Sequence, residues 1–274
     1  MIIDTHVHFG ESLDFKMTKE MVIESMKKYN IDYALVSSIG AVEFDHELKP
    51  IPDALRQKQN EVFCDTIKFA REYPDRIGIY PWIEPYNETA DEEFKKLLKD
   101  NLDIVHGIKL HQFHSKTPAD STRMEPYIKL AQEYNLPIVC HTGGCEEAGV
   151  IHVYNAAKKH PEVNFVMVHM GLGTDNQEAI ELLGKLPNLY GDTTWVPIES
   201  TVQAVKLYGS EKIFFGSDNP IDGVDTYHNN PKGEKSVYQK YFNELEELIG
   251  KENYDNIMFK NAKRVFNIKH IFTF

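Results

Sequence analysis

The chain has 274 residues, a length typical of one α/β barrel rather than of several small domains. Hydrophobic residues make up 42% and charged residues 26% of it, which argues against a disordered chain and against a disulfide-dense secreted scaffold. The net charge is -12 and no Lys/Arg cluster is long enough to follow a phosphate backbone, so we expect no nucleic-acid partner.

No apolar run approaches the roughly 20 residues that cross a bilayer, and the amino terminus (MIIDTHVH) lacks the features of a secretion signal. We therefore expect no membrane association. The three cysteines, Cys64, Cys140 and Cys145, are an odd number without a CxxC spacing, which fits reduced intracellular thiols. These features predict a cytoplasmic protein.

Eight short β-branched or aromatic runs alternate with longer amphipathic stretches along the chain. The predicted strands begin near Ile2, Asp32, Arg76, His106, Pro137, Asn164, Leu189 and Lys212. Thr18 is placed to cap the helix after the first strand, and Pro74 to end the helix before the third. Residues 1–274 are therefore expected to form a single (β/α)8 TIM barrel; a doubly wound open sheet is the alternative.

Two predicted connections are longer than a minimal loop, residues 40–53 after the second strand and 219–236 after the eighth. Long loops at the catalytic end of a barrel often shape or cover the substrate pocket. We expect the same of these two.

Polar side chains recur where predicted strands end. His6 and His8 share a face of the first strand because side chains alternate along a strand, and Asp4 is expected on that face too. Four later strands end in the same manner, at Lys109, His141, His169 and Asp218. Barrel enzymes place their active sites at this end, so the sequence predicts that these groups converge.

Imidazole nitrogen and carboxylate oxygen suit zinc first, and also iron, manganese or nickel. His6, His8, His141 and Asp218 supply enough ligands to leave one position for water or substrate if the ion is five-coordinate. The sequence thus predicts a divalent-metal cofactor whose bound water is the nucleophile.

Five motifs in order, Asp4-Thr5-His6-Val7-His8, Gly107-Ile108-Lys109-Leu110-His111, His141-Thr142-Gly143, His169-Met170-Gly171 and Gly216-Ser217-Asp218, resemble the amidohydrolase superfamily. Together with the closing Asn261-Ala262-Lys263-Arg264-Val265-Phe266, the fourth-strand motif resembles its amidohydrolase-related branch, which includes hydrolases and nonoxidative decarboxylases. The resemblance spans nearly the whole chain.

This resemblance implies that His6, His8, His141 and Asp218 bind the more buried ion and that Asp218 takes a proton from its water. His169 would either ligate a second ion or orient the water or substrate in a one-metal site, which we favour. Lys109 would either bridge two metals as a carbamate or bind a substrate carboxylate through its ammonium group.

Other residues are expected around the same site. His111 shares the strand face of Lys109 and is a candidate substrate contact or proton donor. Trp195 and Tyr227 are candidates to line the substrate cavity. Asp4 is expected to orient a metal-binding imidazole rather than to bind the metal, because a buried imidazole needs an acceptor for its second nitrogen.

The leading functional hypothesis is a hydrolase that acts on an amide, lactone or ester carbonyl of a small molecule. A nonoxidative decarboxylase of a small aromatic acid is the second, and a noncatalytic metal- or ligand-binding barrel the third. The resemblance also allows a homodimer, although no interface stripe stands out in the sequence.

Overall fold

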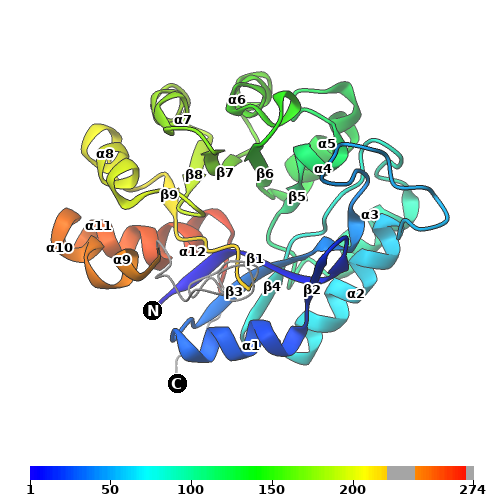
Figure 1. Ribbon diagram of the computed structural model, residues 1–274, viewed down its shortest axis with the longest axis horizontal. Coiled ribbons are helices and arrows are strands. Elements are labelled where there is room, and N and C mark those ends of the chain that lie inside the picture. The colour runs from blue at the N-terminus through cyan, green and yellow to red at the C-terminus, as the bar shows by residue number, and fades with distance from the viewer. Residues whose placement is uncertain (221–237, 270–274) are drawn as a thin grey trace.

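The computed structural model describes residues 1–220 and 238–269, and within them the strands surround a common centre with helices outside (Figure 1). The barrel strands are β1 (Ile3–Ser12), β3 (Tyr33–Ser38), β4 (Ile77–Ile79), β5 (Ile108–Leu110), β6 (Ile138–Gly143), β7 (Phe165–Leu172), β8 (Leu189–Asp192) and β9 (Ile213–Phe214). Each corresponds to one predicted strand in chain order, so the eight-stranded pattern is confirmed.

Parallel pairing runs continuously through β1, β3 and β4 and again from β5 to β9. Single bridges join the two runs. On one side Trp82 pairs with Lys109, and on the other Val7 pairs with Asn219. The second seam is reinforced by the amide of His8, which donates to the Asn219 carbonyl at 2.9 Å. The sheet therefore closes into a barrel, which excludes the doubly wound open sheet.

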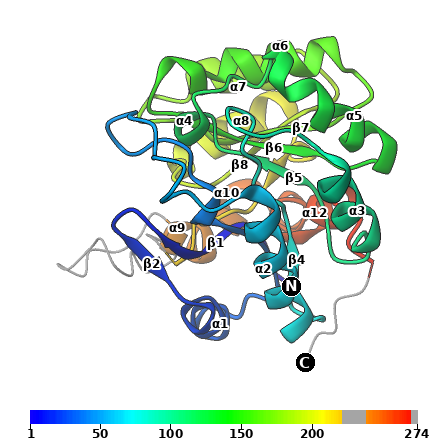
Figure 2. The ribbon, with the colours of Figure 1, turned by 90° about the vertical axis from the view of Figure 1, so that its right-hand side faces the viewer.

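Helices follow most strands and cover the outside of the barrel (Figures 1 and 2). The longer ones are α1 (Lys19–Lys28), α2 (Gln59–Glu72), α3 (Glu92–Asp100), α5 (Glu125–Tyr134), α6 (Val150–Lys159), α7 (Gln177–Leu183) and α8 (Ile198–Tyr208). The shorter ones are α4 (Gln112–Ser115), α9 (Tyr238–Asn243), α10 (Leu245–Ile249), α11 (Lys251–Asp255) and α12 (Asn261–Val265). Thr18 Oγ1 accepts from the amide of Met21 at 3.3 Å, and α2 ends before Pro74, as predicted.

The core has two layers. Inside the barrel, branched and aromatic side chains from alternating strands fill the space below the site, among them Leu35, Tyr80, Val166 and Phe214. A larger apolar layer between the strands and the helices holds the helices in place. The interior is therefore packed, and a site can form only at an end of the barrel.

One element was not predicted. β1 continues past the barrel to Ser12, and β2 (Phe15–Met17) pairs back on it in antiparallel fashion. Phe15-Lys16-Met17 is too short to stand out as a strand in the sequence, and the pairing needs Leu13 in a left-handed conformation, with φ of 52°. The hairpin and α4 lie at the same end of the barrel (Figure 2).

The first long connection shapes that same end. It begins with the 3-10 turn Ile39–Ala41, and a bridge between Phe44 and Pro50 folds the segment back on itself. The second predicted loop, residues 219–236, and its Tyr227 lie almost entirely outside the described residues. Within the described part of the chain, no helix has the length and apolar character needed to span a membrane.

Candidate metal centre

His6 and His8 lie toward the end of the part of β1 that pairs with β3, next to a register shift between Asp4 and Val7. Such an irregularity re-aims side chains, and β-bulges are common beside active sites. The two imidazole rings are nearly perpendicular, at 85°, and their Nε2 atoms lie 2.8 Å apart. The prediction that both side chains share one face is confirmed.

Asp218, just after β9, is half-buried and completes a group with these two buried histidines. Its Oδ1 lies 3.2 Å from His8 Nε2 and 3.6 Å from His6 Nε2. One ligand atom from each of the three residues falls within 4.8 Å of the others. Two imidazole nitrogens and a carboxylate oxygen at this spacing fit zinc, iron or manganese, so the donor set matches the predicted cofactor.

The far nitrogen of each imidazole has its own partner. His6 Nδ1 lies 3.3 Å from Asp192 Oδ2, while His8 Nδ1 lies 3.0 Å from Ser37 Oγ and 3.3 Å from the Ser37 carbonyl. Partners of this kind fix the tautomer and the orientation of metal-binding histidines. Both Nε2 lone pairs are thereby directed at the shared space beside Asp218.

Asp4 does not have the role expected of it. Its carboxylate accepts from the backbone amide of His6 at 3.2 Å and from the amide and hydroxyl of Ser217. Burial raises the pKa of Asp4 to about 7 despite these hydrogen bonds. Asp4 thus ties the backbone of β1 to the segment that carries Asp218, and Asp192 is the acceptor for the imidazole of His6.

Burial and neighbouring groups shift the pKa values of two candidate ligands, His6 and Asp218. Burial, followed by the charge of Lys109, holds the pKa of His6 well below its usual range. Burial alone would raise the pKa of Asp218, but the adjacent imidazoles of His8 and His6 hold it far below the usual range. A neutral imidazole beside a carboxylate is the protonation pattern that a divalent metal requires.

His169 lies in a second irregularity, where β7 shifts register against β6. Its backbone is left-handed, with φ of 66°, and its amide donates to Asp192 Oδ1 at 2.9 Å. Nδ1 of its ring lies 3.1 Å from the Thr194 carbonyl, which leaves Nε2 available. Strained backbone held by buried partners is typical of functional sites.

His141 lies across the site from β1. Its ring is edge-on to His169, with centroids 4.7 Å apart, and stacks on His111 at 3.8 Å. Its nitrogens are not among the atoms that fall within 4.8 Å of one another in the group of His6, His8 and Asp218. The structure therefore brings the predicted fourth ligand to the same cavity but not into that compact group.

Lys109 and Trp195 contact members of the metal group, by which we mean His6, His8 and Asp218. Nζ of Lys109, which is fully buried, lies 3.2 Å from His6 Nε2, and burial lowers the pKa of this lysine to about 8. Trp195 donates from Nε1 to Asp218 Oδ2 at 3.1 Å. Neither residue is among the described residues that line the cavity. Lys109 is therefore placed to act on His6, and Trp195 on Asp218, rather than on a substrate directly.

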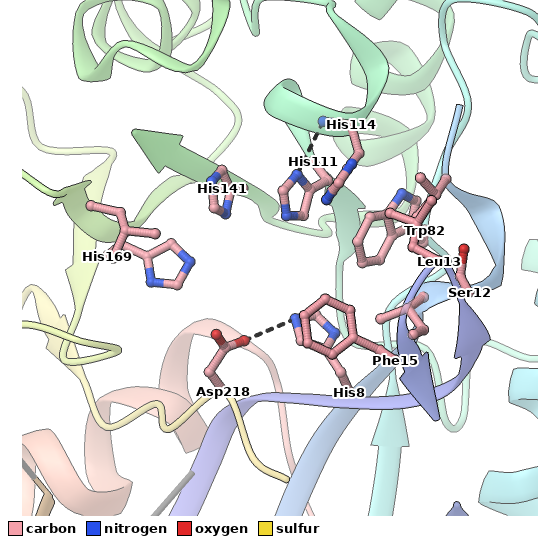
Figure 3. A pocket seen from close by; sticks show the side chains of 13 residues that line it. His8, Ser12, Leu13, Phe15, Trp82, His111, His114, His141, His169 and Asp218 are labelled. Carbon is pink, nitrogen blue, oxygen red and sulfur yellow. Dashed lines mark hydrogen bonds and ion pairs between the residues drawn. The ribbon is translucent and has the colours of Figure 1, made fainter. Parts of the chain in front are cut away.

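A cavity of about 90 Å³ opens above these groups, and Figure 3 shows its side chains. His8, Asp218, His141 and His169 form its polar floor and one side. Its remaining walls are mostly aromatic, imidazole and aliphatic, and the described residues are Ser12, Leu13, Phe15, Ile39, Val42, Trp82, His111, His114 and Leu172. Val42 comes from the first long connection, residues 40–53, so the predicted part of this connection in shaping the pocket is confirmed.

Several site residues were missed in the sequence. Asp192 ends β8 in the same pattern, an apolar run followed by a carboxylate, that identified Asp218, and this signal was overlooked. His114 and Trp82 carry no spacing signal of their own; they reach the cavity through α4 and the segment after β4. Ser12, Leu13 and Phe15 reach it through the unpredicted hairpin.

The comparison with protein families decides the classification. The amidohydrolase family model matches residues 3–268, nearly the whole chain. The chain belongs to the amidohydrolase family. With its His/Asp group at the catalytic end of a TIM barrel, this amidohydrolase is a metal-dependent enzyme of small-molecule chemistry. A search of curated proteins finds no match.

Solved structures share the fold at low identity. They include 4-oxalomesaconate hydratase from Rhodopseudomonas palustris, at 17% identity and TM-score 0.69, over 97% of this chain and 96% of that one. A probable 2-pyrone-4,6-dicarboxylic acid hydrolase from Acinetobacter baumannii has 14% identity and TM-score 0.65, over 97% and 99%. A dihydroxybenzoic acid decarboxylase from Polaromonas sp. JS666, with bound manganese and 2-nitroresorcinol, has 13% identity and TM-score 0.67, over 97% and 96%.

Proposed function

We propose that this amidohydrolase hydrolyses an amide, lactone or ester carbonyl of a small molecule, with one divalent ion held by His6, His8 and Asp218. The observation that carries the proposal is the convergence of two Nε2 atoms and a carboxylate oxygen within 4.8 Å at the floor of the cavity. Zinc is the first choice for mixed nitrogen and oxygen donors, and the manganese in the Polaromonas structure makes that ion the second.

A bound divalent ion would supply Lewis acidity for the substrate carbonyl and lower the pKa of a water molecule toward neutrality. The chain supplies the rest. Asp218 is assigned as the group that takes a proton from the water and passes it to the leaving group. Its carboxylate is held in one orientation, because one oxygen faces the imidazoles and the other accepts from Trp195.

His169 is assigned to orient the water or the carbonyl oxygen. Its Nδ1 side is occupied by the Thr194 carbonyl and its amide by Asp192, so the ring presents Nε2 to the cavity in one orientation. His141 stands beside it and is assigned to the ion as a further ligand. Aromatic and aliphatic side chains form much of the cavity wall, so a bound substrate would displace water and strengthen the electrostatic contacts inside.

The experiment is a panel of small amides, lactones and esters assayed with zinc-loaded or manganese-loaded protein, alongside Asp218→Asn. We expect turnover that depends on the metal and falls by at least about 100-fold in the variant, which is the lower range for a general acid-base group. Equal turnover by both proteins would refute the role of Asp218.

Nonoxidative decarboxylation is the second candidate. It is supported by the fold shared with dihydroxybenzoate decarboxylases and by the aromatic wall of Trp82 and His111. Carbon dioxide released from aromatic hydroxy acids, with no water incorporated into the product, would favour it. Failure of both panels with metal-loaded protein would favour the noncatalytic binding barrel.

A further inference from the structure

We propose that His111 selects the substrate by donating its Nε2–H to a second oxygen atom that the substrate carries beside its reacting carbonyl. This inference rests on the proposed function and deepens it. The substrate class is a small planar carbonyl compound, of one ring at most, that bears a further hydroxyl, keto or carboxylate oxygen.

The ring of His111 is held between two parallel rings. Trp82 stacks on it with centroids 4.9 Å apart and an interplanar angle of 12°, and His141 stacks on it from the other side at 3.8 Å and 15°. A ring clamped on both faces cannot turn out of its plane without losing both contacts. The direction of its nitrogens is therefore set before a substrate enters.

The hydrogen bonds of α4 determine which nitrogen carries the proton. His111 is the N-cap of that helix, and its Nδ1 accepts from the backbone amide of His114 at 3.3 Å. A neutral imidazole has one acceptor nitrogen and one donor nitrogen, so the proton resides on Nε2.

The donor nitrogen points into the cavity. Figure 3 shows the Nδ1 edge of the His111 ring turned to the backbone nitrogen of His114, and the opposite edge turned to the space above His8 and Asp218. Trp82, His111 and His141 cover one another's faces in the stack, so it is the ring edges that they present to a ligand in the cavity. Ring edges carry partial positive charge, so this wall favours the oxygen atoms and the π-face of a planar ligand.

The size of the cavity limits the ligand. About 90 Å³ is less than the roughly 150 Å³ of an engineered apolar cavity that binds benzene. A single ring therefore does not fit inside completely. Its polar edge would face the floor, and the rest would extend outward past the exposed side chains of Leu13 and Leu172. Within that space a substrate oxygen can reach His111 while the carbonyl lies over the metal group.

The test is binding of benzamide and its 2-, 3- and 4-hydroxy derivatives to the zinc-loaded protein, measured as Kd by ligand-observed NMR. We expect at least one hydroxy isomer to bind at least fivefold more tightly than benzamide. His111→Phe keeps an aromatic ring in the stack without the donor, so in this variant the preferred isomer should bind no more tightly than benzamide. His111→Gln, which retains an N–H donor, should restore part of the preference.

His152→Phe is the matched control, because His152 is paired with Asp120 outside the cavity and its loss should change no Kd. If His111→Phe does not fold, isotope-labelled histidine in the wild-type protein gives the same information, with His111→Gln identifying the resonance. Its Nε2–H signal should shift with the preferred isomer and not with benzamide.

The proposal is overturned if the four compounds bind equally or not at all, or if the preference survives in His111→Phe. Turnover of the amide, lactone and ester panel tests the proposed reaction independently of these binding measurements. A preference that depends on His111 without any turnover would leave this assignment standing and refute the proposed reaction.

Discussion

Asp192 and His6 form a buried pair in which the carboxylate Oδ2 lies 3.3 Å from imidazole Nδ1. The other oxygen of Asp192 accepts the amide of His169 at 2.9 Å. One side chain thus orients a candidate metal ligand and fixes the strained turn that presents a candidate catalytic histidine. Asp192, the last residue of β8, is buried, so it acts through these two residues rather than on the substrate.

Asp192→Asn should weaken zinc binding by about 10-fold to 100-fold, the usual effect of removing the partner of a metal-binding histidine. Isothermal titration calorimetry on the metal-free protein measures this directly. Asp120→Asn is the matched control because it breaks an Asp–His pair of the same kind, with His152, on another part of the chain. An unchanged zinc affinity in Asp192→Asn would contradict the role assigned to Asp192.

Lys109→Met should strengthen zinc binding because the ammonium group lies 3.2 Å from His6 Nε2 and repels a cation there. Wild-type Lys109 can relieve that repulsion by losing its proton. With a pKa of about 8 this costs about 1.4 kcal/mol at pH 7, so the gain should be at most about tenfold at pH 7 and vanish near pH 9.

Zinc titrations at both pH values check this, with Lys116→Met as a control away from the metal group. A one-ion site keeps its stoichiometry in the variant. If the wild-type protein instead binds two ions in the presence of bicarbonate and Lys109→Met binds one, Lys109 bridges two metals as a carbamate and the one-ion assignment is wrong.

Glu43 provides a pH-dependent test of the loop that forms part of the cavity wall. Its fully buried carboxylate accepts from the amide and the side chain of Asn87 at 2.7 and 2.9 Å, and burial raises its pKa to about 7. A carboxyl group whose pKa is higher in the folded state than in the unfolded state lowers the free energy of unfolding as the pH rises, because the unfolded chain ionises first. Its contribution is therefore present below about pH 4.5 and is lost as the pH rises to about 7.

Glu43→Gln removes this titration, so the variant should gain stability relative to wild type by up to about 3 kcal/mol between pH 4.5 and pH 8. Urea unfolding at several pH values measures the difference, in which the titration of all other groups cancels. The exposed Glu47 on the same loop serves as the control through Glu47→Gln. A difference that does not vary with pH would show that Glu43 titrates normally.

Much of the fold and the candidate site was predictable because both depend on local patterns. Each barrel strand is an apolar run, and His6, His8 and Asp218 directly follow or end such runs, so chain order alone places them at one level. The hairpin at Phe15 was not predictable, since three residues carry too little pattern. Asp192 carried the right pattern, but only the closed barrel shows that its carboxylate reaches His6 while that of Asp4 reaches Ser217.

The distinction between neighbouring histidines also required the structure. Spacing placed His111 on the strand face of Lys109, but it did not show that the ring is clamped between two others. Nor did it show that His114, whose Nδ1 donates to the Phe44 carbonyl at 2.7 Å, also lines the cavity. Likewise, His141 was predicted to be a metal ligand on the same grounds as His6 and His8. Its place beside His111 and His169 follows from how far apart β1 and β6 lie on the closed barrel.

The most direct measurement is anomalous diffraction at the zinc edge from crystals of the zinc-loaded protein. We expect one strong peak per chain, about 2.0–2.2 Å from Nε2 of His6, Nε2 of His8 and a carboxylate oxygen of Asp218. A peak located elsewhere, or these three side chains pointing apart with no metal between them, would contradict the metal centre on which the proposed chemistry depends.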